Sequence, residues 1–219
     1  MVKFFETNFS YDYQWPAVTL AYFLRYPNPY STHVVSSDTL SSFVNPETGN
    51  LHITRLHLKR GKLPASVARF IPKIKESYIL ERSVIDARNQ RMCTESRNLD
   101  WEGVLSVVEN QEYVPAADPA RTDVKTIVKF ESRLGHRKRE EEKRGFFQGW
   151  GTSGVRASLE VVGRSRMRDG LMKSREGMKL VLEQLRERGF VGVVKEQRQG
   201  GWERWKKVWR GDHGMEEAR

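Results

Sequence analysis

The feature that most constrains this chain is a series of strand-like segments, interrupted once by a short helical pattern and followed by a long one. The strand patterns cover residues 1–9, 31–44, 50–60, 76–86, 90–99, 103–114 and 122–134. Most neighbours are joined by short turns, which predicts an antiparallel meander. Such a sheet has an open apolar face, and the helical pattern at residues 154–189 is long enough to cover it. We therefore expect an α+β fold with a ligand cavity between a curved sheet and a helix.

The short helical pattern between the first two strands has predictable ends. Proline is well tolerated in the first helical turn, so Trp15-Pro16 predicts where this helix begins. The residue before a proline disfavours the helical conformation, so Pro27 predicts that the helix ends near Arg25-Tyr26. Arg25 therefore lies at the carboxyl end of the helix, where a cation commonly interacts with the helix dipole at the surface.

The composition is that of a globular chain and excludes several kinds of site. The chain has 219 residues, of which 38% are hydrophobic and 30% are charged. No run of eighteen apolar residues is present, so we expect no membrane-spanning helix. Cys93 is the only cysteine, which excludes an internal disulfide and a zinc site made of several cysteines. Residues 1–16 have neither a secretory nor a transit-peptide pattern, and we expect no metal and no cofactor.

The positive charge is concentrated in the carboxyl-terminal part of the chain. Residues 1–130 contain 16 basic and 14 acidic residues, whereas residues 131–219 contain 22 basic and 14 acidic residues. This asymmetry indicates an anionic partner, which is a nucleic acid, an anionic membrane or an acidic small molecule. A solubilising helix surface of mixed charge explains the same counts equally well.

The long helical pattern has two different faces. One face is an ordinary core stripe, made of Met167, Leu171, Met178, Val181, Leu182 and Leu185. The neighbouring face carries Arg166 and Lys173 among apolar residues, with Gly170 and Gly177 beside them. Glycine inside a helix costs about 1 kcal/mol relative to alanine, so two glycines on one face indicate that space is needed there. Such a face suits an anionic headgroup with acyl chains, or else the cations reach solvent and the glycines allow close packing.

Several motifs, in the same order, resemble the PRELI/MSF1 family. The most specific motif is Arg25-Tyr26-Pro27-Asn28-Pro29-Tyr30-Ser31, which is followed by His33-Val34. The other motifs are the opening MVKFF, Arg55-Leu56, Gly61-Lys62-Leu63-Pro64, Arg97-Asn98-Leu99-Asp100 and Lys173-Ser174-Arg175-x-Gly177-Met178. The resemblance covers about residues 1–187 apart from a charged insertion at 135–152.

The resemblance implies a fold and a function. Members have a START-like (PITP-like) fold, in which a seven-stranded antiparallel sheet is wrapped around a lipid pocket and closed by a long C-terminal helix. They are lipid transfer proteins of the mitochondrial intermembrane space, and they act with a small helical-hairpin partner that has twin Cys-x9-Cys disulfides. The proline between Asn28 and Tyr30 is similar to the phosphatidic-acid carriers, whose fungal members supply cardiolipin synthesis. The implied ligands are thus phosphatidic acid and, transiently, anionic membrane surfaces.

The resemblance also implies site residues. Arg25 matches the cation that binds the lipid phosphate, a role that suits the planar, permanently charged guanidinium. The other headgroup or entrance positions are His33, Lys59, Lys62, Arg166 and Lys173. Residues 61–72 match a lid loop, in which Leu63, Val67, Phe70 and Ile71 cover the acyl chains or enter the bilayer. Each of these residues also has an ordinary interpretation, as a surface cation, a packed histidine or a folded surface loop.

We therefore expect residues 1–189 to form a lipid-transfer domain and residues 190–219 to form a basic tail. Trp202, Trp205 and Trp209 would share one face of a helix in that tail, a pattern typical of membrane interfaces, and disorder is the alternative. Competing functions are a carrier of phosphatidylserine or another anionic lipid, and a basic nucleic-acid-binding module, for which no motif is present. No acid–base or nucleophilic constellation is recognisable, so we expect no enzyme.

Overall fold

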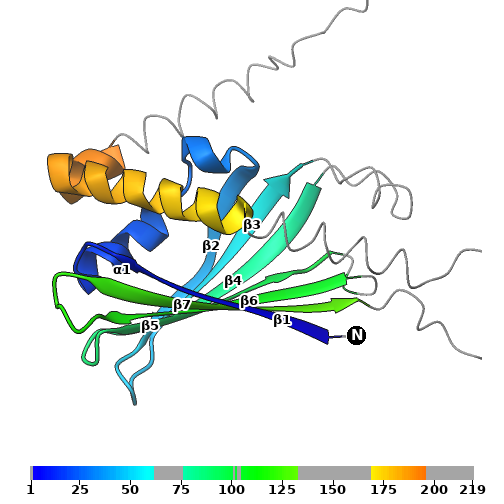
Figure 1. Ribbon diagram of the computed structural model, residues 1–219, viewed down its shortest axis with the longest axis horizontal. Helices are drawn as coiled ribbons and strands as arrows, with labels where there is room; N and C mark the ends of the chain where they lie inside the picture. Colours follow the sequence, from blue (N-terminus) through cyan, green and yellow to red (C-terminus); the bar gives the residue numbers. More distant parts are fainter. Residues whose placement is uncertain (1, 62–75, 101, 103–104, 133–168, 196–219) are drawn as a thin grey trace, which may run out of the picture.

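The computed structural model describes residues 2–61, 76–100, 102, 105–132 and 169–195, coloured by sequence in Figure 1. The elements are β1 (Val2–Tyr11), α1 (Trp15–Leu24), the 3₁₀ turn η1 (Pro29–Ser31), β2 (Val34–Val44), β3 (Leu51–Arg60), β4 (Glu76–Asp86), β5 (Arg91–Asn98), β6 (Leu105–Pro115) and β7 (Thr122–Ser132). A further helical stretch covers residues 169–195 and is called the C-terminal helix below.

The seven strands form a single antiparallel sheet in the order β1-β7-β6-β5-β4-β3-β2. Strands β2 to β7 follow one another as a meander, and β1 pairs with β7, so β1 and β2 are the two edges. The tight β2–β3 turn is stabilised by Asn45, whose side chain accepts a hydrogen bond from the Glu47 amide, and by Gly49 at φ 74°. The expected seven-stranded antiparallel sheet with a C-terminal helix is confirmed.

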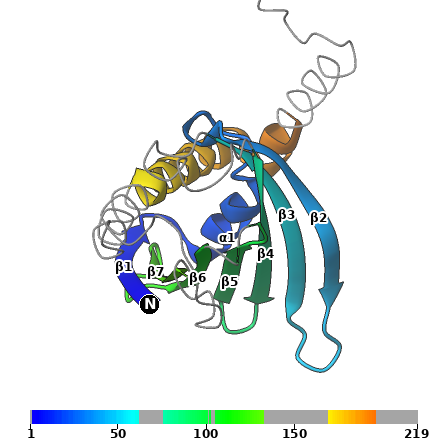
Figure 2. The same cartoon turned by 90° about the vertical axis from the view of Figure 1, so that its right-hand side faces the viewer.

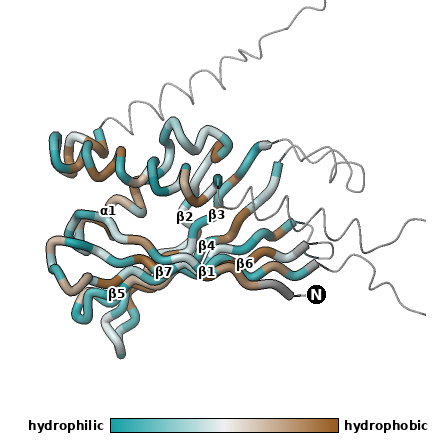
Figure 3. The backbone as a smooth tube through the Cα atoms, viewed as in Figure 1, coloured by the Kyte–Doolittle hydropathy of each residue, from teal (hydrophilic) through white to brown (hydrophobic). Residues whose placement is uncertain are grey.

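Both α1 and the C-terminal helix lie on the same side of the sheet, which curves around them (Figures 1 and 2). α1 begins at Trp15 with proline in its first turn and ends at Leu24, as the two proline signals predict. Hydrophilic and hydrophobic residues are interspersed along the strands (Figure 3).

The C-terminal helix continues beyond the position at which the pattern predicted its end. Gly189 has φ +67°, and residues 190–195 are again helical. Glycine adopts this left-handed conformation without steric penalty, so the chain can be redirected there and resume a helix. Val193 is then buried, which gives these extra residues a packing reason to stay helical. Of the predicted core stripe, Leu171, Met178, Val181 and Leu182 are buried, and Leu185 is partly buried against the same core. Met167 lies outside the described residues.

The main hydrophobic core lies at one end of the concave face, where α1 and the C-terminal helix meet the sheet. We call this region the apolar end; its buried members are Tyr11, Trp15, Val18, Ala21, Tyr22, Ile85, Met92, Tyr113, Val124, Met178, Val181 and Leu182. Trp15 keeps its indole N–H satisfied by donating to the Tyr113 carbonyl oxygen at 3.1 Å.

The same strands carry charged residues a few positions further along the same face. Leu51 and Ile53 of β3 pack against the apolar end. Side chains alternate along a strand, so Arg55 and His57 share the inward face with them, and both are buried. Arg55 lies directly opposite Glu81 of β4 in the ladder. The concave face therefore changes from hydrocarbon to buried charge within one strand.

Candidate functional site

Arg25 is delivered to the concave face by the end of α1. It is the carboxyl-terminal cap residue of that helix, and it is only 8% exposed. The turn after it is held by Asn28, whose side-chain amide donates to the Arg25 carbonyl oxygen at 2.5 Å and whose side-chain oxygen accepts from the Tyr30 amide at 2.9 Å. The specific Arg25–Ser31 motif thus encodes a fixed exit from the helix, with the guanidinium turned inward.

One buried carboxylate binds the guanidiniums of two arginines. Glu81 is 1% exposed, and its Oε2 lies 2.5 Å from Nη2 of Arg25. Its other oxygen, Oε1, accepts from Nη2 of Arg55 at 2.5 Å and from Nε of Arg55 at 2.8 Å. His57, which is 2% exposed, places Nε2 3.2 Å from Oε2. We call Arg25, Arg55, His57 and Glu81 the Glu81 cluster.

The two arginines are bound to different extents. All three guanidinium nitrogens of Arg55 donate hydrogen bonds. Nη1 donates to the Phe23 carbonyl oxygen at 3.2 Å, and Nε and Nη2 both donate to Glu81. Arg25 reaches Glu81 through one nitrogen, and its Nη1 makes a long bond of 3.4 Å to the Tyr22 carbonyl oxygen. Its Nε is buried and has no hydrogen-bond partner within the described part of the chain.

Aromatic rings surround the Arg25 guanidinium. Its central carbon lies 3.6 Å from the centre of the Tyr22 ring and 4.9 Å from that of Tyr26. Rings of this kind attract a desolvated cation through their quadrupole, without neutralising it. Arg25 therefore keeps its positive charge although its side chain is buried.

The charges of the cluster shift the ionisation of their neighbours. Burial works to raise the pKa of Glu81, but Arg25, His57 and Arg55 together hold it well below its ordinary value. Burial lowers the pKa of His57, and the two arginines add to this effect while Glu81 opposes it. Burial raises the pKa of Glu109 of β6, although the positive charges of Lys59 and Arg25 act to lower it. The Glu81 carboxylate thus faces two guanidiniums, and burial opposes the ionisation of the neighbouring Glu109.

Three of the predicted cations lie at one rim of the concave face. His33 precedes β2, Lys59 is near the end of β3, and Lys173 is in the first described turn of the C-terminal helix. Val34 is paired with Lys59 in the ladder, and the His33 carbonyl oxygen accepts from the Arg60 amide at 2.7 Å. Burial lowers the pKa of His33, and Lys59 and Lys173 lower it further, so all three groups are close enough to interact.

The close packing expected of a helical glycine is found at Gly177. A Cβ there would meet the side-chain amide of Asn28 at 2.8 Å, so only glycine leaves room for the turn after α1. The C-terminal helix is therefore packed directly on the residue that holds the Arg25 turn. At Gly170 nothing lies within 4 Å of the corresponding position among the described residues.

The remaining predicted site residues lie outside the described part of the chain. These are Lys62, Arg166 and the lid residues Leu63, Val67, Phe70 and Ile71. Sequence reasoning gave no role to Glu81, Arg55 or His57, which are the immediate neighbours of Arg25. A signal was available, because Arg55 and His57 follow Leu51 and Ile53 at the inward positions of one alternating strand. Buried charges at such positions are rare without a partner.

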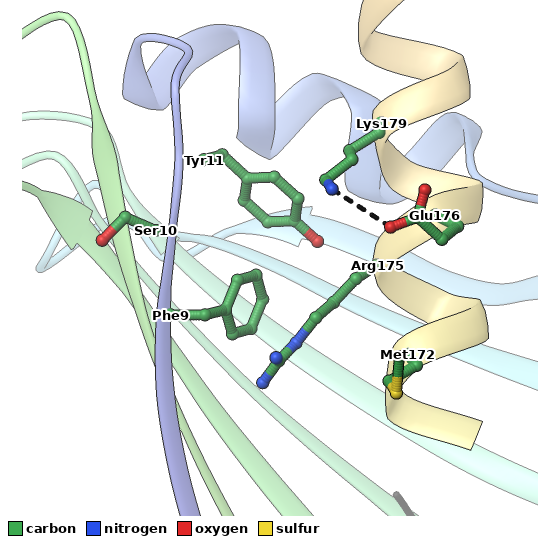
Figure 4. A pocket seen from close by; sticks show the side chains of 7 residues that line it. All are labelled: Phe9, Ser10, Tyr11, Met172, Arg175, Glu176 and Lys179. Carbon is green, nitrogen blue, oxygen red and sulfur yellow. Dashed lines mark hydrogen bonds and ion pairs between the residues drawn. The ribbon is translucent and has the colours of Figure 1, made fainter. Parts of the chain in front are cut away.

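A separate cavity of about 240 Å³ lies between the β1 edge and the C-terminal helix (Figure 4). It is lined by Phe9, Ser10, Tyr11, Met172, Arg175, Glu176 and Lys179. The Arg175 guanidinium lies 3.8 Å from the centre of the Phe9 ring and donates to the Thr7 hydroxyl at 3.2 Å, while Lys179 pairs with Glu176 at 3.0 Å. This cavity shares no lining residue with the Glu81 cluster, so it is not the site built around Arg25.

Among the residues that the structure describes, no cluster of three or more histidine, cysteine, aspartate or glutamate side chains is arranged to hold a metal ion. None of the described helices combines the length and apolar character needed to cross a membrane.

Comparison with known proteins gives consistent matches over most of the chain. Residues 16–188 match the model of the PRELI-like family. The Saccharomyces cerevisiae protein named "Protein UPS1, mitochondrial" is 36% identical over 187 residues, covering 85% of this chain and 97% of that protein. "Protein ups1 homolog" of Schizosaccharomyces pombe is 37% identical over 171 residues, covering 78% of this chain and 89% of that protein. The human "PRELI domain-containing protein 1, mitochondrial" is 28% identical over 188 residues, covering 84% and 77%.

Proposed function

Because this chain belongs to the PRELI-like family, we propose that it is a non-enzymatic carrier of phosphatidic acid between the outer and inner mitochondrial membranes. The family membership confirms the resemblance found in the sequence, and relatives named as mitochondrial agree with the expected mitochondrial localisation. The placement in the intermembrane space, the supply of cardiolipin synthesis and the twin Cys-x9-Cys partner remain parts of this proposal.

The observation that carries the proposal is the excess of positive charge in the Glu81 cluster. Two buried guanidiniums share the Glu81 carboxylate, which compensates one of the two charges, and burial opposes the ionisation of the neighbouring Glu109. An uncompensated buried charge is expensive, and natural proteins retain one where a ligand of opposite charge completes the site. A lipid phosphate has that charge, and Arg25 has a nitrogen, Nε, still able to donate to it.

The surroundings of this cation fit the rest of a phospholipid. His33, Lys59 and Lys173 form a basic rim through which an anionic headgroup would enter. Lys62, Arg166 and the lid residues would extend this rim, as the family resemblance implies. Cations next to apolar lid residues would also favour transient docking on an anionic bilayer.

The decisive test is lipid transfer between liposomes by the purified full-length chain. Labelled phosphatidic acid, phosphatidylserine and phosphatidylcholine are offered in separate donor liposomes, with and without the proposed partner. We expect fast transfer of phosphatidic acid, slower transfer of phosphatidylserine and no transfer of phosphatidylcholine, because the last has no net negative charge. Equal transfer of all three lipids, or of none, would refute the proposal. Faster transfer of phosphatidylserine than of phosphatidic acid would mean that the protein is a lipid carrier, but that its lipid is phosphatidylserine.

The same samples test the absence of catalysis. A carrier returns its lipid unchanged, so mass spectrometry should find intact phosphatidic acid after many rounds of transfer. Release of inorganic phosphate or diacylglycerol in proportion to protein would show an enzyme instead.

A further inference from the structure

We propose that Glu81 is a displaceable counter-ion of Arg25, which competes with the lipid phosphate for the Arg25 guanidinium and thereby promotes lipid release. The inference rests on the proposed function, since it concerns how the same site exchanges its anionic ligand. It assigns a role to a residue that the family motifs in the sequence do not single out.

The first argument is the unequal bonding of the two arginines. Arg55 holds Oε1 of Glu81 with two nitrogens and uses its third on the Phe23 carbonyl oxygen, so it is a fixed anchor for the carboxylate. Arg25 contacts the other oxygen through a single nitrogen. Breaking that one contact leaves Glu81 bound to Arg55, so Arg25 is the partner that can be exchanged.

The second argument is that Oε2 does not lose every partner when Arg25 leaves. His57 Nε2 lies 3.2 Å from that oxygen without yet forming a hydrogen bond, so a rotation of the imidazole would let it donate there. A buried carboxylate oxygen without a donor would be strongly unfavourable, and the histidine lowers this penalty. His57 is thus a positioning residue, because it lowers the free-energy cost to the Glu81 carboxylate of losing its contact with Arg25.

The third argument concerns the elements that carry the two sides of the ion pair. Arg55, His57 and Glu81 all belong to the paired strands β3 and β4, which fix them relative to one another. Arg25 comes from the end of α1, and the Tyr22 and Tyr26 rings support its guanidinium independently of Glu81. The guanidinium can therefore turn from carboxylate to phosphate while the rings still contact it.

A carrier benefits from such a competitor because it must release what it binds. A site that binds a phosphate with two unopposed guanidiniums would retain the lipid at the acceptor membrane. Glu81 supplies an anion of fixed position that takes Arg25 back as the phosphate departs. It also partly compensates the charge of Arg25 between rounds, when an unpaired buried cation would destabilise the fold.

The test compares Glu81→Gln with wild type and with Glu112→Gln as the matched control. Glutamine keeps the size of the side chain and removes its charge. Glu112 forms an ion pair of 2.6 Å with Arg91 whose side chains are exposed, so its substitution changes the same chemical group far from the cluster. The probe for binding is dioctanoyl phosphatidic acid, with dioctanoyl phosphatidylcholine as the uncharged comparison.

Two readouts are measured on each protein. The first is the rise in melting temperature on adding dioctanoyl phosphatidic acid, which we expect to be larger for Glu81→Gln than for the other two proteins. The second is the rate at which preloaded, labelled phosphatidic acid passes to acceptor liposomes, which we expect to fall tenfold or more. Glu112→Gln should match wild type in both, and phosphatidylcholine should stabilise none of them.

Each outcome decides the inference separately from the proposed function. If wild type transfers phosphatidic acid and Glu81→Gln releases it equally fast, Glu81 is no competitor. If Glu81→Gln does not fold and phosphatidic acid does not restore folding, Glu81 only stabilises the two arginines, and the inference is again wrong. A variant that folds only when phosphatidic acid is present supports it, because the phosphate then replaces the missing carboxylate. Failure of wild type itself to bind or transfer phosphatidic acid would refute the proposed function instead.

Discussion

The apolar end and the Glu81 cluster are adjacent regions of one concave face, and they use the same strands for opposite purposes. At the apolar end, each fully buried side chain of the size of leucine contributes about 1.5–3 kcal/mol to folding. In the cluster, the desolvation of two guanidiniums and one carboxylate offsets most of their mutual attraction, so such a group adds little net stability. The first region therefore makes the fold, and we propose that the second is retained for a ligand.

Tyr22 belongs to both regions and shows how closely they are joined. Its ring packs edge-on against Tyr113 in the core, with ring centres 5.5 Å apart, and its face lies 3.6 Å from the Arg25 guanidinium carbon. Burial raises the pKa of Tyr22, so its hydroxyl stays neutral and adds no second anion to the site. Tyr22 therefore contacts both the hydrocarbon of the core and the charge of the cluster.

The largest effect is expected at the apolar end. Leu182 is 1% exposed, so Leu182→Ala should lower the free energy of unfolding by about 3 kcal/mol, through lost burial and the cavity left behind. Val191→Ala, on the same helical stretch but 77% exposed, should change it by less than about 0.5 kcal/mol. Denaturant unfolding measures both. Lipid transfer per folded molecule should change little in either, and a loss of transfer by folded Leu182→Ala would break the separation of the two regions.

The next effect concerns the contact that joins the C-terminal helix to the Arg25 turn. A Cβ at residue 177 would be 2.8 Å from the Asn28 amide, so Gly177→Ala should destabilise by about 1–2 kcal/mol and slow lipid transfer. Gly170→Ala is the matched control, because nothing lies near that position among the described residues. It should be neutral or stabilising by up to about 1 kcal/mol, since alanine favours the helix. Equal behaviour of the two variants in urea unfolding would show that Asn28 adapts freely.

The sequence predicted the fold well for a physical reason. Strand patterns, prolines around α1 and the core stripe are local signals, and the seven strands and α1 were found within a few residues of the predicted bounds. The segment predicted to begin a strand at residue 31 starts instead with the 3₁₀ turn η1, and residues 154–168 of the predicted long helix lie outside the described residues. The end of the C-terminal helix was missed because Gly189 stops a helix locally, while the burial of Val193 extends it through a tertiary contact. The prediction was limited to what neighbouring residues determine.

The site was predicted only through its cations. Arg25, His33, Lys59 and Lys173 are matched by family motifs, and the structure brings the last three to one rim and places Arg25 inside. The partner of Arg25 was not predictable from local pattern, because Glu81 is 56 residues away in the chain and meets it only when β4 pairs with β3. Charge pairs of this kind depend on register, which the sequence alone did not determine.

A smaller effect is expected from acidification, and it arises in the cluster. The folded pKa of His57 is below its ordinary value of 6.5, so as the pH falls below 6.5 the unfolded chain gains a proton that the folded protein does not. The free energy of unfolding should therefore fall with decreasing pH, by at most about 1.4 kcal/mol per pH unit for one proton. The pKa of Glu81 is also depressed in the folded protein. The free energy of unfolding should therefore fall further as the pH drops below 4.5, the ordinary pKa of this group.

Substituting each histidine in turn separates the contributions of His57 and His33 to this pH dependence. His57→Gln should flatten the decline in unfolding free energy as the pH falls below 6.5. His33→Gln should flatten it less, because that side chain is exposed. Urea unfolding at several pH values gives both slopes. An unchanged slope in His57→Gln would mean that His57 accepts a proton in the folded protein.

The smallest effect is expected at the basic rim. Lys59→Gln should weaken binding to anionic liposomes by about 1 kcal/mol, which is about fivefold, and the double variant with Lys62→Gln should weaken it further. Added salt should weaken wild-type binding in the same way. Lys125→Gln is the control, because Lys125 pairs with Glu6 at 3.1 Å between β7 and β1. Binding that does not change with salt would mean that the protein docks on the membrane through apolar contacts alone.

The most direct test of the claim that the Glu81 cluster is the headgroup site is phosphatidic-acid transfer by Arg25→Gln. Its control is Arg121→Gln, because Arg121 pairs with Asp12 at 2.9 Å on the surface and its substitution removes the same group from an exposed site. Circular dichroism first confirms that both variants are folded. We expect Arg25→Gln to lose at least about nine-tenths of wild-type transfer, because a buried charge-assisted bond to phosphate is worth about 1.5–3 kcal/mol, and Arg121→Gln to keep it. Undiminished transfer by folded Arg25→Gln would show that the phosphate binds elsewhere.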